Sequence, residues 1–190
     1  MKKPPSPQHH NPFDDWRSIF IALYMTLVGY GVLVAIPVIS SARVELLGFS
    51  AEQVGRLASA DLGGLAVGAA LASWFMAKAN RRILVAGGAF LAILANASCT
   101  LYSQYEPTLS LRILAGIGSG LYTAVAVANL GATSRPARAY NLMLFAFAFS
   151  QALELKILPQ LTMNGIYGVF MGGYALGLLA LAWIPSHDPV

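Results

Sequence analysis

Hydrophobic residues occur along this chain in six long stretches that short polar segments separate. A membrane-spanning helix needs about 20 mostly apolar residues, because each residue advances it by 1.5 Å across a hydrocarbon core roughly 30 Å thick. The pattern therefore predicts spanning helices at 18–41, 51–77, 83–103, 109–131, 140–162 and 166–185. Because the connections are short, we expect a single all-α transmembrane domain at 16–185, with a disordered cytoplasmic tail at 1–15 and a second tail at 186–190.

Two local patterns predict where one helix begins and where helices pack closely. Ser50 and Gln53 have the spacing of a capping box, which places the start of the second helix at residue 51. In lipid, two helices approach each other closely where small residues recur every four positions. Glycines with that spacing include Gly64 with Gly68, Gly168 with Gly172, and Gly173 with Gly177.

The composition narrows the class of protein. Hydrophobic residues make up 57% of the 190 positions and charged residues only 11%. A soluble domain has roughly a quarter of its residues charged, and a disordered chain combines low hydrophobicity with high charge. Both classes are excluded, which leaves a membrane protein. The histidines lie in the predicted tails, at His9, His10 and His187, so we expect no metal site and no cofactor.

Basic residues are distributed unevenly between the two sides of the predicted bundle. If the N-terminus is inside, three arginines fall on the outer side, Arg43, Arg56 and Arg112. Eight basic residues then fall on the inner side: Lys2, Lys3, Arg17, Lys78, Arg81, Arg82, Arg135 and Arg138. Cytoplasmic segments carry the excess of lysine and arginine. We therefore expect a multi-pass protein of the cell membrane, of the bacterial inner membrane type, with both termini cytoplasmic.

Ionisable residues within the apolar stretches are the first candidates for function. Asp61 falls near the predicted midplane, and Arg112 and Glu154 fall in the outer half. A charged side chain at the bilayer centre costs about 2.5–3.5 kcal/mol on insertion scales, so these groups should find partners or water. Since their helices are adjacent in sequence, we expect Arg112 and Glu154 to face each other. The hypothesis is that Asp61 or Glu154 takes up a proton and that Arg112 stabilises the charged carboxylate.

Polar and aromatic side chains share helix faces with these charges at spacings of three and four residues. A water-filled cavity between helices requires polar stripes of this kind. Five residues of these stripes are expected to line a substrate path: Thr26, Tyr30, Thr123, Phe147 and Gln151. The alternative is a buried hydrogen-bond network that only fixes how the helices pack.

Two segments carry a resemblance to a known family. Residues 73–82 read SWFMAKANRR, with basic side chains at Lys78, Arg81 and Arg82, and residues 112–120 read RILAGIGSG. With six helices and both ends inside, the chain resembles the N-terminal half of a major facilitator superfamily transporter. The first segment is similar to the basic loop after helix two, although the acid and two glycines of that pattern are replaced. The second is similar to the arginine and glycine pattern of helix four.

The resemblance implies a fold and a function. It implies two inverted three-helix repeats, proton coupling near helix four, and secondary active transport of a small solute by alternating access. Because such a cavity needs a second wall, we expect a homodimer or a separate second half. The alternatives are a non-transporting membrane scaffold or assembly subunit, or a truncated inactive fragment. We expect no enzyme, because no nucleophile and base have catalytic spacing in the spans, and no nucleic-acid partner.

Overall fold

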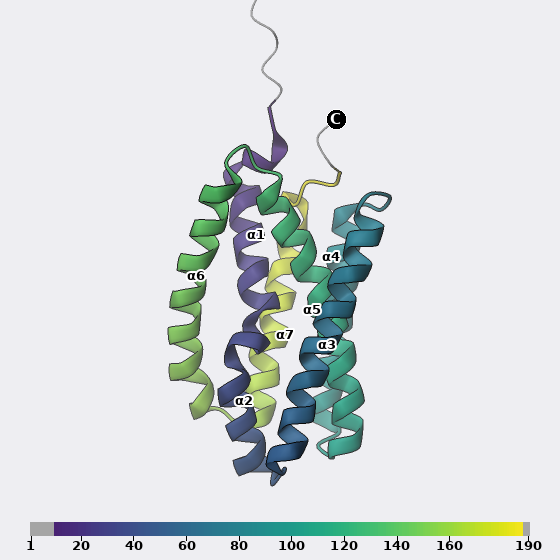
Figure 1. Ribbon diagram of the computed structural model, residues 1–190, viewed down its shortest axis with the longest axis vertical. Coiled ribbons are helices and arrows are strands. Elements are labelled where there is room, and N and C mark those ends of the chain that lie inside the picture. Colours follow the sequence, from purple (N-terminus) through teal and green to yellow (C-terminus); the bar gives the residue numbers. More distant parts are fainter. Residues whose placement is uncertain (1–9, 188–190) are drawn as a thin grey trace, which may run out of the picture.

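A computed structural model describes residues 10–187, and all regular secondary structure in that part of the chain is helical. The α-helices are α1 (Trp16–Gly29), α2 (Gly31–Leu47), α3 (Ala51–Met76), α4 (Arg81–Leu101), α5 (Tyr105–Gly131), α6 (Pro136–Ile157) and α7 (Met163–Leu179). Short 3-10 helices are η1 (Pro12–Asp14), η2 (Leu158–Gln160) and η3 (Leu181–Trp183). The helices run along one long axis, with the start of α1 and η3 at the same end (Figure 1).

The helices have the dimensions of membrane spans. Five helical segments are long and apolar enough to cross a membrane, with α1 and α2 together forming the first, Trp16–Leu47. The sixth apolar helix, α7, has 17 residues and begins three positions before the predicted stretch 166–185. The prediction of an apolar helical membrane bundle is therefore confirmed, and the order of its repeats remains a prediction.

The capping box predicted at the start of the second span is present. The Ser50 side chain accepts a hydrogen bond from the backbone N–H of Gln53, and the Gln53 side chain accepts one from the backbone N–H of Ser50. These two bonds satisfy donors that the first helical turn leaves without a partner. As predicted, α3 begins at Ala51.

The first span is broken at Tyr30, between α1 and α2. The Ser119 hydroxyl of α5 donates a hydrogen bond to the backbone carbonyl of Gly29 at the end of α1. A side chain that inserts into the ladder of helical hydrogen bonds interrupts a helix. Such a break is tolerated at membrane depth where a neighbouring helix satisfies the freed backbone group, as Ser119 does here.

Helices α3 and α5 make the closest helix contact in the bundle. A Cβ on Gly64 would collide with the backbone carbonyl of Ile113, and one on Gly116 would approach the backbone of Gly64 too closely. The glycines therefore let the two backbones touch, as the predicted role of Gly64 requires. The same spacing at Gly168 and Gly172 marks no contact, because the space around both positions is open.

The beginning of the described chain departs from the predicted disordered tail. Residues 1–9 of that tail and residues 188–190 of the second lie outside the described residues. The described part folds onto the bundle, because Phe13 of η1 is fully buried with the Arg81 guanidinium 5.0 Å from its ring centroid. The Asn11 side chain also donates a 2.9 Å hydrogen bond to the turn between α5 and α6. Sequence reasoning missed this fold because the four prolines of the segment are typical of disorder.

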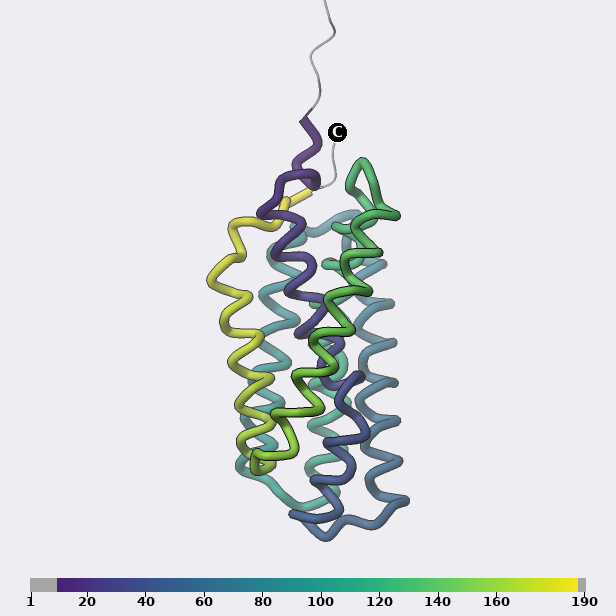
Figure 2. The backbone as a smooth tube through the Cα atoms, turned by 90° about the vertical axis from the view of Figure 1, so that its left-hand side faces the viewer, coloured from purple at the N-terminus to yellow at the C-terminus, as the bar shows by residue number. Residues whose placement is uncertain are grey.

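Helix α6 lies at one edge of the bundle, in front of α1 and α2 in Figure 2. Ala139 is its single buried residue. Large apolar side chains such as Phe145 and Phe149 are 69% and 72% exposed. An apolar surface of this kind faces lipid or another protein.

The packing of α3 on α5 generates a prediction about two adjacent glycines. Gly64→Ala should lower the free energy of unfolding by about 1–3 kcal/mol, because its new Cβ meets backbone that cannot move aside. Gly63→Ala is the matched control, since nothing lies within 4 Å of a Cβ there, and it should leave stability unchanged or raise it by roughly 0.5–1 kcal/mol. Thermal unfolding in mild detergent measures both. Equal effects would contradict the close contact.

Candidate functional site

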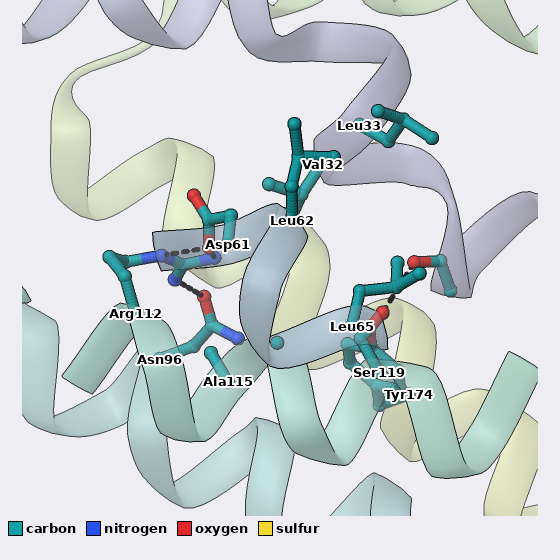
Figure 3. Close-up of a pocket in the computed structure, with 12 residues that line it drawn as sticks. Val32, Leu33, Asp61, Leu62, Leu65, Asn96, Arg112, Ala115, Ser119 and Tyr174 are labelled. Carbon is teal, nitrogen blue, oxygen red and sulfur yellow. Dashed lines mark hydrogen bonds and ion pairs between the residues drawn. The ribbon is translucent and has the colours of Figure 1, made fainter. Parts of the chain in front are cut away.

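Four polar side chains meet in the interior of the bundle, which we call the polar cluster: Arg43 of α2, Asp61 of α3, Asn96 of α4 and Arg112 of α5. Arg112 Nε and Nη2 each lie 2.7 Å from Asp61 Oδ1, and Arg112 Nη1 donates a 2.8 Å hydrogen bond to Asn96 Oδ1. Arg43 Nη1 lies 4.0 Å from Asp61 Oδ2. Figure 3 shows Arg112 between Asp61 and Asn96. The cluster therefore joins four helices.

The glycine contact between α3 and α5 positions this ion pair. Asp61 precedes Gly64 by three residues and Arg112 precedes Gly116 by four, so each charged residue lies about one turn before the contact point. Both side chains lean toward the starts of their helices, as all helical side chains do. Since α3 and α5 run in the same direction, the two side chains meet directly.

The cluster is shielded from solvent. Arg43 and Arg112 are each 2% exposed, and Asp61 is 6% exposed. Away from water, attraction between unlike charges is stronger, and an unpaired charge is much more costly than at the surface. The Asp61 carboxylate is therefore held by two arginines, and losing it would leave two buried cations without their shared anion.

A narrow cavity lies beside the cluster. Its volume is about 20 Å³, room for about one water-sized group. It is flanked by Asp61, Arg112 and Asn96 on one side and by Leu33 and Leu62 on the other (Figure 3). These two leucines are 40% and 41% exposed. The remaining residues around it are Gly29, Val32, Leu65, Ala115, Gly116, Ser119 and Tyr174.

The predicted pairing of Arg112 with Glu154 is wrong. Arg112 binds Asp61 instead, and the Glu154 carboxylate accepts a 3.3 Å hydrogen bond from Ser150 on its own helix. The reason is the course of α6, which packs mainly on α1 and α2. It meets α5 near the connecting turn, where Tyr140 donates a hydrogen bond to the α5 backbone. Similar depth on helices adjacent in sequence did not bring the two charges together.

The five residues assigned to a substrate path lie in different surroundings. Thr26 and Thr123 are buried between α1 and α5, and their hydroxyls donate to carbonyls of their own helices. The rings of Tyr30 and Phe147 make an edge-to-face contact with centroids 5.7 Å apart. Gln151 is exposed on α6. The structure thus brings Tyr30 and Phe147 together, and the path itself remains a prediction.

The first residues of α4, which follow the loop after α3, contact the segment that follows η3. Arg82 Nε donates a 2.6 Å hydrogen bond to the carbonyl of Ile184, and the backbone N–H of Arg81 donates one to Ser186. The Arg81 side chain also donates to Asn129 of α5. Lys78 is exposed. Arg81 and Arg82, two of the three residues of this predicted motif, therefore stabilise one end of the bundle.

Sequence reasoning missed Arg43 and Asn96 as members of the cluster. The predicted first span ended at residue 41, which put Arg43 in an outer segment, whereas α2 continues to Leu47. Asn96 carries no charge, and the signal available was a strong hydrogen-bonding amide within an apolar stretch. The residues that the structure describes contain no group of three or more His, Cys, Asp or Glu side chains able to hold a metal ion.

The burial of the cluster predicts a large effect of one substitution. Asp61→Asn should lower the free energy of unfolding by about 3–5 kcal/mol, because it leaves two buried guanidinium groups without their shared carboxylate. Glu52→Gln is the control, since Glu52 pairs with Arg56 on the exposed start of α3, and it should change stability by less than about 1 kcal/mol. Thermal unfolding of the purified variants measures both. An Asp61→Asn protein as stable as the control would contradict the ion pair.

No protein-family model matches this chain, and no curated protein matches it.

Proposed function

We propose that this chain is one half of a membrane transporter, similar to the N-terminal half of a major facilitator superfamily protein, that moves a small solute by alternating access. The observation that supports it is the polar cluster and its cavity, buried in apolar helices and adjacent to the break in the first span. Charged residues inside a membrane domain mark substrate or ion pathways by default. Broken helices are a common feature of transporter binding sites.

The pattern of helix neighbours supports two repeats. The first span can be exchanged with α5, α3 with α6, and α4 with α7. Most pairs of helices in contact then become other pairs that are also in contact. The packing of α3 and α4 on α5 corresponds to the packing of α6 and α7 on α1, and α1 with α5 and α4 with α7 correspond to themselves. A transporter built from two inverted three-helix repeats has this pattern.

In this proposal the second wall of the cavity is another polypeptide surface, either a second copy of the chain or a separate half. The exposed positions Leu33 and Leu62 at the cavity then face the transport pathway. The exposed apolar face of α6 adds surface for the same contact. The bilayer surrounds the remaining helices.

Glu154 and Asp61 are the proposed sites of proton coupling. Asp61 has two arginine neighbours, whereas Glu154 has no cation within ion-pair distance among the residues that the structure describes. Glu154 also lies next to the break, because a Cβ on Gly31 would be 3.3 Å from its Oε1. A carboxyl placed there can link its own protonation to the geometry of the first span.

The competing function is a membrane scaffold or assembly subunit. Its supporting observation is that the cluster is almost completely buried and bonded across three helices, α3, α4 and α5. Buried polar networks of this kind can act by fixing how helices pack. The two functions differ in whether water reaches the face of the bundle that carries Leu33 and Leu62.

Cysteine labelling tests the proposed pathway. In a Cys99→Ser background, Leu62→Cys on α3 should react with a membrane-impermeant maleimide in intact membranes. A thiol that faces a water-filled pathway can ionise to the thiolate, which is the reactive form. The matched control is Leu94→Cys on α4, another exposed leucine in the middle of its helix, which should stay unreactive because it faces lipid. We expect a rate at least about tenfold higher at Leu62→Cys. Equal, slow labelling of both would overturn the transporter and favour the scaffold.

A further inference from the structure

The polar cluster contains more positive than negative charge. Arg43 and Arg112 carry two positive charges and Asp61 carries one negative charge, while Asn96 is neutral, so the formal sum is +1. A net charge buried away from water is stable only when a counter-charge accompanies it. The residue responsible for the surplus is Arg43, because Arg112 is directly bonded to Asp61.

The two arginines also differ in whether their hydrogen-bond donors have partners. The Nε and Nη2 groups of Arg112 both contact Asp61. The corresponding Nε and Nη2 groups of Arg43 are buried and have no hydrogen-bond partner among residues 10–187. Buried donors in proteins almost always have a partner, so two on one guanidinium require an explanation.

Among the residues that the structure describes, no other side chain around the cluster supplies the missing negative charge. Cys99 and Tyr167 lie beside Arg112, and neither side chain is a carboxylate. The nearest acids along α2 and α3 are Glu45 and Glu52, and both are exposed. Within the described part of the chain, Arg43 has a single carboxylate neighbour, Asp61, at 4.0 Å.

We propose that the polar cluster binds one small monovalent anion, a halide or a single carboxylate group, on the Nε and Nη2 edge of Arg43. That edge presents two parallel N–H donors, and in Arg112 the same edge holds a carboxylate. The cavity of about 20 Å³ lies in the same cluster, beside Asp61, Arg112 and Asn96. The Arg43 edge is itself buried, so a bulky anion cannot reach it. The anion neutralises the surplus charge, and the site does not depend on whether the chain transports a solute.

Anion-dependent stability tests the site on the purified full chain in detergent. At equal ionic strength, replacing sodium gluconate with sodium chloride should raise Tm saturably, by about 5 °C, because an anion that binds only the folded state stabilises it. Arg43→Gln should remove this rise while remaining folded, since Asp61 and Arg112 still neutralise each other. Arg56→Gln is the matched control, because Arg56 is an exposed arginine paired on the surface with Glu52, and it should keep the full rise.

A second measurement needs no variant and separates the two sources of the anion. The protein should broaden the ³⁵Cl resonance of chloride, and formate should reverse the broadening while gluconate should not. If formate reverses the broadening at a concentration lower than that of chloride, a carboxylate group is the preferred ligand. If a formate concentration higher than that of chloride is needed, a halide is the preferred ligand. The proposal is overturned if wild-type protein neither broadens the resonance nor gains stability in chloride. An unchanged chloride response in Arg43→Gln would overturn it as well.

Discussion

The structure depends on one carboxylate shared by two guanidinium groups inside an apolar bundle. Asp61 lies directly against Arg112 and 4.0 Å from Arg43, and all three side chains are almost inaccessible to solvent. Away from water this attraction is strong, but each ion has lost its hydration. The arrangement is therefore stable only while α2, α3 and α5 keep these groups together. Asn96 extends the same constraint to α4 through its bond to Arg112.

This constraint divides the bundle into two parts with different packing. Helices α3, α4 and α5 form a compact unit in which glycine contacts bring backbones together. Helix α6 contributes a single buried residue, and its carboxylate, Glu154, bonds to a serine on the same helix. The first span connects the two parts and is interrupted at Tyr30, where a hydroxyl from α5 replaces a helical bond.

The end of the bundle that holds the start of α1 and η3 is fixed by contacts to backbone carbonyls. Arg81 and Arg82, from the loop that resembles a family motif, bond to the segment after α7. Phe13 is buried beneath Arg81. Arg82 donates to the carbonyls of Ala182 and Ile184 at the end of η3, which otherwise lack donors. The start of α4 therefore contributes to holding this end of the bundle together.

The sequence by itself determined the elements of this protein. Apolar length predicted the membrane helices, the Ser50 capping box predicted the start of α3, and the intramembrane charges predicted that Asp61 and Arg112 need partners. These are local properties, set by helix geometry, capping and the cost of charge in lipid.

Only the tertiary structure decided which partners meet. Gly64 contacts a neighbouring backbone while Gly168 does not, although both have the same spacing, and Arg112 binds Asp61 instead of Glu154. Depth and helix face follow from a residue's position in its own helix, but the neighbour across the interface follows from how all the helices pack. Arg43 joins the polar cluster because α2 continues to Leu47, beyond the predicted end of the first span at residue 41.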